Sequence, residues 1–209
     1  MRVAQVLSEG ESQGFAYGTI MHAWLALIDW LDDGPLPDET RLREAISRLE
    51  DVDFTSSEID SLIGEFRAVV ARPAVAELLR RGYYRAPRDG FLASKVAQTL
   101  HWQSLTAEVC CERRFALRRG ERMVTGSIDR LVLLRDSGRI VAADVLDFKT
   151  DAVTPNERDA FDARVAFYTP QLAEYRRVVS ELLQLEPERI AARLVFLKSG
   201  AIVPVELEA

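Results

Sequence analysis

Residues 124–150 read VTGSIDRLVLLRDSGRIVAADVLDFKT, and this stretch decides the fold. Two apolar runs rich in valine, isoleucine and leucine flank the sequence Asp-Ser-Gly at 136–138, which is typical of a tight turn. The runs 124–134 and 140–150 are therefore predicted to be paired antiparallel strands. The second run is apolar on both faces, which favours a central strand covered on both sides.

Charged side chains lie at the end of the second run. In Asp147-Phe148-Lys149, the alternation of a strand places the carboxylate and the ammonium on one face and the phenyl ring on the other. Residues whose numbers sum to about 274 are expected to pair across the turn, which places Asp129 near residue 145 and within a diagonal step of Asp147. Two carboxylates so close repel each other unless a cation lies between them. The pattern indicates a divalent-cation site, although each acid alone is more often an ordinary strand-end residue.

Further strands and a helix are expected around this hairpin. Strands are predicted at 109–117, 191–197 and 201–207, the last two joined by a turn at 198–200. Thr169-Pro170 is typical of the start of a helix, which is predicted to run through Leu183.

The first half of the chain has the spacing of helices. Apolar residues recur with a helical period from Ile20 to Leu31. Further helices are predicted around Leu42–Leu49, from the capping-box sequence Thr55-Ser56-Ser57-Glu58 to Val70, and from Pro73 to Leu79. The stretch 82–105, which contains glycine and proline, is predicted to be a loop. The predicted fold class is α/β, with a helical lobe ahead of a sheet.

The composition is that of a folded globular chain. The 209 residues are 48% hydrophobic and 29% charged, with a net charge of −6, which excludes wholesale disorder. A single domain over 1–209 is expected, with a mainly helical lobe at about 1–105 and an α/β core carrying the cation site at about 106–209. No apolar run reaches the ~18–20 residues of a membrane span, and the N-terminus does not resemble a signal peptide, so a cytoplasmic location without membrane contact is expected.

Two features argue against other kinds of site. The two cysteines of the chain, Cys110 and Cys111, are adjacent and too few for a zinc finger or an iron–sulfur cluster. The sequence lacks the Gly-x-x-x-x-Gly-Lys-Ser/Thr loop, so this chain is not expected to bind a nucleotide or to act as a motor.

Arginine is concentrated between residues 112 and 122. Arg118 and Arg119 belong to this run, which holds five arginines against two glutamates. A net charge of −6 does not exclude nucleic acid, because phosphate is bound by local patches rather than by net charge. The run is predicted to bind phosphate or, alternatively, to be solvated surface.

Three motifs occur in order along the second half of the chain: Gly126-Ser127-Ile128-Asp129-Arg130, Asp147-Phe148-Lys149-Thr150 and Gln171-Leu172-Ala173-Glu174-Tyr175. They resemble the series Gly-x-x-Asp-Arg, Asp-(Tyr/Phe)-Lys-(Thr/Ser) and Gln-x-x-x-Tyr of the RecB-type nucleases. These enzymes are a branch of the PD-(D/E)XK superfamily found at the C-terminal end of AddA- and RecB-like helicase–nuclease subunits. Glu112 with Phe115, and the upstream His22, resemble two further elements of the family. The similarity is dense from Glu112 to Gly200 and reaches the helical half through His22.

The resemblance implies a restriction-endonuclease-like mixed sheet flanked by helices, and a Mg²⁺- or Mn²⁺-dependent deoxyribonuclease that hydrolyses phosphodiester bonds. The implied site consists of Asp129, Asp147, Lys149 and Glu112 for catalysis, of His22, Asp129, Asp147 and the Phe148 carbonyl for the metal, and of Gln171, Tyr175 and Arg130 for DNA, joined by Arg118 and Arg119 of the basic run.

The family further implies single-stranded DNA as the substrate and a role in recombinational DNA repair at the nucleoid. A helicase domain or subunit of an AddAB/RecBCD-like complex is the implied partner. The alternatives are a catalytically silent module that binds DNA or scaffolds a repair complex, and a hydrolase of another phosphoester. The second alternative leaves the Gln-x-x-x-Tyr helix unexplained.

Overall fold

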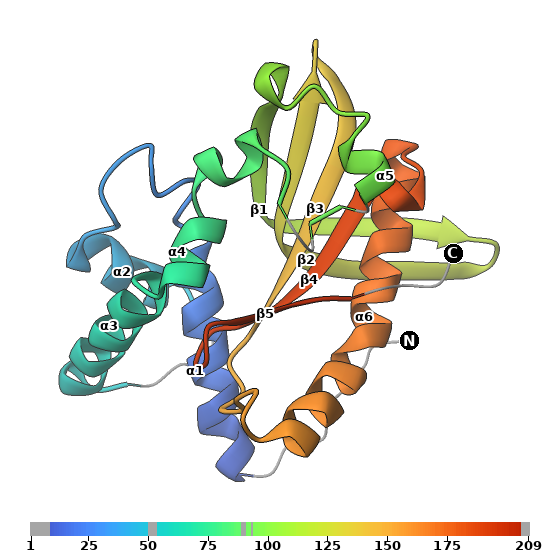
Figure 1. The fold of residues 1–209 in the computed structure, drawn as a ribbon. Coiled ribbons are helices and arrows are strands. Elements are labelled where there is room, and N and C mark those ends of the chain that lie inside the picture. Colours follow the sequence, from blue (N-terminus) through green and yellow to red (C-terminus); the bar gives the residue numbers. More distant parts are fainter. Residues whose placement is uncertain (1–8, 50–53, 89–90, 93, 206–209) are drawn as a thin grey trace.

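The computed structural model describes residues 9–49, 54–88, 91–92 and 94–205. The helices are α1 (Glu9–Leu25), α2 (Glu39–Ile46), α3 (Ser56–Val70), α4 (Pro73–Leu78), η1 (Arg81–Arg85), α5 (Ser94–Ala97), η2 (Trp102–Ser104), α6 (Arg158–Leu183) and η3 (Pro187–Arg189). The strands are β1 (Thr106–Arg119), β2 (Arg122–Asp136), β3 (Arg139–Lys149), β4 (Ile190–Phe196) and β5 (Ala201–Pro204). The helical region thus precedes the sheet along the chain, as predicted (Figure 1).

The strands form one mixed sheet in the order β1-β2-β3-β4-β5. β3 and β4 are parallel, whereas the other neighbouring strands are antiparallel. Parallel neighbours need a crossover connection, and α6 provides it. β3 lies at the centre of the sheet, which confirms the prediction made from its two apolar faces.

Helices cover both faces of the central strands. On one face, Leu146 and Phe148 of β3 pack in a core cluster with Trp24 of α1. On the other face, Val145 packs in a second cluster with Leu172 of α6. Each fully buried side chain of this kind stabilises the fold by roughly 1.5–3 kcal/mol relative to an exposed one. The architecture is the predicted one, a mixed sheet with flanking helices (Figure 1).

The β2–β3 hairpin contains a β-bulge near its turn, where Val141 is the extra residue of β3. The numbers of paired residues sum to 275 at the turn, where Asp136 pairs with Arg139, and to 276 beyond the bulge, against the expected value of about 274. Beyond the bulge, Arg130 pairs with Leu146. Asp129, one residue further, is therefore level with Asp147 rather than with residue 145, which corrects the expected register.

The start of α6 also differs from the prediction. The helix begins at Arg158, whereas Thr169-Pro170 was predicted to open it, so Pro170 lies inside the helix. The turns before the proline are held by tertiary packing, since the ring of Phe161 lies 4.9 Å from that of Phe196 on β4. Such packing overrides the local preference of proline for a first helical turn.

In the helical region, local signals predicted some boundaries well and others poorly. The capping box of Thr55 and Glu58 opens α3 as predicted. α1 runs from Glu9 to Leu25, whereas a helix from Ile20 to Leu31 was predicted. The last apolar residues of that pattern form a turn that packs on the sheet.

Residues 82–105 were predicted to be a loop, but the described part of this stretch contains short helical turns. A buried network fastens η1 to the sheet. The carboxylate of Asp144 on β3 accepts a hydrogen bond from the Tyr84 hydroxyl at 2.9 Å and pairs with Arg193 of β4. Because an unpaired buried charge costs several kcal/mol, the network fixes this segment against the strands. None of the helices in the described ranges is long and apolar enough to cross a membrane.

Candidate metal centre

The sheet opens where β2 and β3 separate. Arg130 and Leu146 form the last β2–β3 pair, after which β3 continues beside β4 to Lys149 and β2 continues beside β1. Asp129 and Asp147 lie at this opening, one on each diverging strand. Neighbouring elements can therefore bring side chains to both carboxylates.

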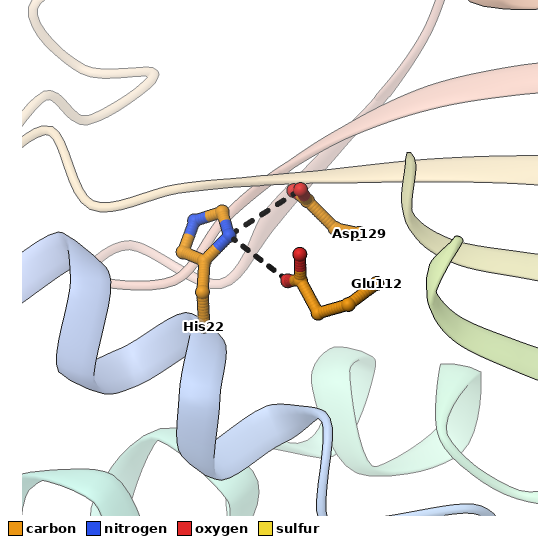
Figure 2. Close-up of side chains that lie close together, drawn as sticks. All are labelled: His22, Glu112 and Asp129. Carbon is orange, nitrogen blue, oxygen red and sulfur yellow. Dashed lines mark ion pairs between the residues drawn. The ribbon is translucent and has the colours of Figure 1, made fainter. Parts of the chain in front are cut away.

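Three side chains from three elements meet at the opening (Figure 2). Nδ1 of His22 on α1 lies 3.3 Å from a carboxylate oxygen of Asp129 on β2 and 3.8 Å from one of Glu112 on β1. The ligand atoms of these residues all lie within 4.8 Å of one another. One imidazole nitrogen and two carboxylate oxygens that face a common point are suitable ligands for a divalent cation.

The backbone of Phe148 joins this group. Its N–H donates to a carboxylate oxygen of Asp129 at 2.7 Å, and its carbonyl oxygen lies 3.1 Å from Nε2 of His22. The phenyl ring packs with α1 in the core, so the backbone of Phe148 faces the site. The structure thus brings His22, Asp129 and the Phe148 backbone, which the family resemblance implied as metal ligands, into mutual contact, with Asp129 at Nδ1 of the imidazole and the Phe148 carbonyl at Nε2.

The backbone of Glu112 is irregular at this point. Its φ of 47° lies in the left-handed region, which is uncommon for a residue other than glycine. Its carboxylate accepts a hydrogen bond from the Ser127 hydroxyl at 3.1 Å and faces His22. Strained conformations of this kind cluster at functional sites, where the surrounding structure holds them.

Asp147 and Lys149 lie on one face of β3, as predicted. The ammonium of Lys149 lies 2.6 Å from a carboxylate oxygen of Asp147 and donates to the side-chain oxygen of Gln171 at 3.1 Å. It also lies 4.1 Å from the centre of the Tyr168 ring, in a cation–π contact. Three partners therefore hold the Lys149 ammonium beside the acids.

One face of α6 borders the site. The side-chain amide of Gln171 donates to the hydroxyl of Tyr175 at 2.8 Å, and the ring of Tyr175 packs edge-on against Phe115 of β1. A Cβ at Gly126 would lie 2.7 Å from the Phe115 ring, so any other residue would force that ring to move. The glycine of the first motif thus allows the close approach of β2 to this ring.

The surroundings of the site raise the pKa values of two of its groups, Asp147 and His22. Burial and the negative charge of Asp129 raise the pKa of Asp147 to about 6, although Lys149 lowers it. Burial alone would lower the pKa of His22, but its hydrogen bonds with Asp129 and Glu112 and their charges raise it to about 10. Negative charge around the opening contributes to both shifts, after burial in the case of Asp147.

This negative charge is the structural argument that a divalent cation fits. Asp129, Asp147 and Glu112 place three carboxylates around one opening, and the carboxylate of Asp147 is held in a buried position. A cation bound by His22 and the acids would relieve the repulsion between them. The donor set of one nitrogen and several oxygens accepts Mn²⁺ and also Mg²⁺, which prefers oxygen.

The predicted DNA contact of Arg130 is wrong for this structure. Its side chain is 1% exposed, and its guanidinium donates to the carbonyl of Ile28 at 2.7 Å and also to that of Asp29. Arg130 follows Asp129 on the strand, so it points to the opposite face, where it caps the chain just after α1. Its position indicates that it anchors the helix that carries His22.

The arginines of the basic run lie on a two-stranded arm. Residues 113–128 of β1 and β2 pair with each other beyond the edge of β3, and this β1–β2 arm extends past α6 (Figure 1). Arg118 is exposed near the tip of the arm. Arg119 instead forms ion pairs with Glu174 at 2.5 Å and Glu181 at 2.7 Å, which fasten the arm to α6.

Sequence reasoning missed Tyr168 and Asp151 as parts of the site. The hydroxyl of Tyr168 donates to the Asp151 carboxylate at 2.8 Å, which holds the ring under the Lys149 ammonium. Tyr168 lies seven residues before Tyr175 on α6, a spacing that would have indicated a shared helix face. The predicted helix start at Thr169 excluded Tyr168 from that face.

Carboxylates, an imidazole and a lysine at the opening of a mixed sheet flanked by helices are the groups that a metal-dependent phosphodiesterase uses. Comparison with protein families gives a more particular assignment. The model of the PD-(D/E)XK nuclease superfamily matches residues 1–207, and the chain belongs to this superfamily. Members of this superfamily are generally metal-dependent nucleases. A search among curated proteins finds no significant match.

Proposed function

We propose that the protein is a Mg²⁺- or Mn²⁺-dependent deoxyribonuclease that hydrolyses phosphodiester bonds near the ends of single-stranded DNA. The observation that carries the proposal is the meeting of His22, Glu112 and Asp129 beside the Asp147–Lys149 pair. This arrangement combines cation ligands with a fixed ammonium, as hydrolysis of a phosphodiester requires.

Each side chain has a separate task in the proposed reaction. A divalent cation at this site supplies positive charge to the scissile phosphate and makes a water molecule a stronger nucleophile. His22, Asp129, Asp147 and the Phe148 carbonyl hold it, and Glu112 assists from its place beside His22. The Lys149 ammonium orients the attacking water or stabilises the charge that develops on the phosphate.

The DNA backbone is proposed to run along α6 and the β1–β2 arm. Gln171 fixes Lys149 and Tyr175 and faces the approaching strand from α6. Arg118 and Arg119 were both predicted to bind phosphate. Of the two, Arg118 is exposed on the arm and is available for this contact. Arg119 serves this surface indirectly, because its ion pairs hold the arm in place.

The RecB-type motifs support the finer parts of the proposal. The resemblance favours single-stranded DNA delivered by a helicase domain or subunit, in an AddAB- or RecBCD-like complex that acts in recombinational repair. A cytoplasmic, nucleoid-associated location follows from that substrate.

Incubation of the protein with labelled single-stranded and double-stranded DNA tests the proposal. Cleavage is expected with Mg²⁺ or Mn²⁺, to be abolished by chelation, and to be faster on the single strand. A protein that binds DNA in the presence of both metals but does not cut it would instead be a catalytically silent module. Equal cleavage with and without metal would contradict the site assignment.

A further inference from the structure

Phe167 is an aromatic side chain that the proposed site does not use. Large apolar side chains are exposed at four positions in the described part of the chain, and Phe167, with 59% of its surface exposed, is the most exposed of them. Its ring packs edge-on against Tyr168, with 5.0 Å between the ring centres. Exposing a phenyl ring to water is unfavourable. The neighbours of Phe167 can therefore indicate which ligand would cover the ring.

Phe167 lies beside the proposed reaction centre. The Lys149 ammonium is 4.1 Å from the centre of the Tyr168 ring, which in turn is 5.0 Å from that of Phe167. These two distances together limit the separation of the Phe167 ring centre from the ammonium to about 9 Å. The ring is therefore close enough to the ammonium for neighbouring parts of one DNA strand to reach both.

The helix places Phe167 in line with the site. Phe167, Gln171 and Tyr175 are spaced four residues apart on α6, so they follow one face of the helix. Gln171 contacts Lys149 and Tyr175 through its side chain. A strand whose phosphate lies at Lys149 would therefore pass over this face and reach the phenyl ring.

The ring has a firm support. The Tyr168 hydroxyl donates a hydrogen bond to the Asp151 carboxylate at 2.8 Å, and the Tyr168 ring packs against Phe167. Pro170 interrupts the backbone hydrogen bonds of α6 next to these aromatic residues, and α6 is bent along its length in Figure 1. The bend is consistent with a ring that faces solvent while Phe161, earlier on the helix, packs against the sheet.

We infer that Phe167 is a stacking platform for one unpaired base of the DNA strand at the site. The inference rests on the proposed nuclease function and specifies the form of its substrate. Every base offers an aromatic face, so such a contact tolerates any sequence. A base inside a duplex is already stacked between its neighbours, so the platform favours single-stranded DNA or a frayed end.

Direct binding measurements test this inference. The variants are made in an Asp147→Asn background and measured with a chelator, so that cleavage is suppressed, and fluorescence anisotropy reports the affinity for a labelled single-stranded 12-mer and for its blunt duplex. Phe167→Leu keeps an apolar side chain but removes the aromatic face, so it is expected to weaken single-strand binding roughly 5- to 140-fold. Duplex affinity is expected to stay within about twofold, because no unpaired base reaches the ring.

Two further variants make the comparison specific. Leu182 lies on the same helix and is 52% exposed, so Leu182→Ala is a matched control that should leave both affinities unchanged. Phe167→Trp retains a stacking face and should retain single-strand affinity. An oligonucleotide with abasic sites throughout should bind the background protein and its Phe167→Leu variant equally.

The outcomes separate this inference from the proposed function. If the wild type cuts single-stranded DNA with metal but Phe167→Leu binds it as tightly as the background protein, the stacking inference is overturned and the nuclease assignment stands. Equal losses for the duplex, or for abasic DNA, would equally overturn it. If the wild type neither binds nor cuts DNA, the proposed function and this inference fail together.

Discussion

The ionised carboxylate of Asp147 is energetically unfavourable in the metal-free fold. It is buried and has a negative neighbour in Asp129, and the pKa of Asp147 is raised to about 6. Because the folded state holds this proton more tightly than the unfolded state does, the residue makes the metal-free protein less stable as the pH rises from about 4 through 6. A group that opposes folding but lies at the centre of the site is better explained by function than by stability.

Replacing Asp147 with asparagine should therefore separate activity from folding. We expect cleavage to fall by at least about 100-fold, which is the upper end of what loss of an outer-shell partner of a metal site costs. The free energy of unfolding of the metal-free protein above pH 6 should not decrease, because the carboxylate repulsion is removed. Urea unfolding at several pH values, with the exposed Asp162→Asn on α6 as a control, measures this. Full activity in a folded Asp147→Asn protein would remove Asp147 from the site.

His22 links metal affinity to pH. The pKa of His22 is raised to about 10 in the metal-free protein, so its imidazole must lose a proton before it can bind a cation. Between pH 7 and 8.5 the affinity for Mn²⁺ should rise about tenfold per pH unit. Calorimetry in buffers of different ionisation enthalpy should detect the released proton.

The variant His22→Ala provides the comparison. It should bind Mn²⁺ more weakly, show a flatter pH dependence, and lose part of the preference for Mn²⁺ over Mg²⁺, because imidazole favours Mn²⁺. Identical affinities and pH slopes for the wild type and the variant would show that α1 contributes no ligand.

At the scale of residues, the sequence singled out several side chains that lie together in the structure, but it did not predict their geometry. Asp129 and Asp147 were expected within a diagonal step, and the turn at Asp136–Arg139 together with the bulge at Val141 places them level. His22 could not be assigned from local spacing, because its partners lie on strands about a hundred residues away. Motif resemblance identified His22, and the structure shows its proximity to Asp129 and Glu112.

In the β1–β2 arm, the strand geometry determines which arginines are exposed. Alternation along a strand gives neighbouring arginines different surroundings, so Arg118 is exposed whereas Arg119 is paired with Glu174 and Glu181. A run of arginines in the sequence does not contain this distinction. Likewise, α6 was predicted too short, because the turns ahead of Pro170 are held by the contact of Phe161 with Phe196 on β4, which no local pattern reveals.

The two arginines should therefore respond differently to substitution. Arg118→Ala should reduce the slope of log affinity for single-stranded DNA against log salt by about 0.7, the value for one lost phosphate contact. Arg119→Ala should change that slope less, but should speed hydrogen exchange in the arm, because its ion pairs with α6 are lost. Salt titrations and exchange measurements on both variants decide this. If neither variant changes the slope, the arm is solvated surface.

At the scale of the whole molecule, the site depends on how the helical region is fixed to the sheet. α1 is held by core packing through Trp24 and, just beyond its end, by the guanidinium of Arg130. β2 thus contributes to the site twice, through the carboxylate of Asp129 on one face and the anchor of Arg130 on the other. The sequence predicted both a helical lobe and a sheet, but the contacts that join them are long-range and appear in no local pattern.

A cation that joins α1 to β2 should stabilise the folded molecule as a unit. At a metal concentration about 100 times the dissociation constant, binding to the folded state alone adds about 2.7 kcal/mol to the free energy of unfolding. For a chain of this size, that corresponds to an increase in Tm of roughly 5–11 °C. Hydrogen exchange of the amides around His22 should slow in parallel. The reason is that α1 is then fixed to β2 through the metal at Asp129 as well as through Arg130 on the opposite face of the strand. Asp129→Asn should abolish both effects, and a variant that keeps the full Tm increase would place the metal elsewhere in the molecule.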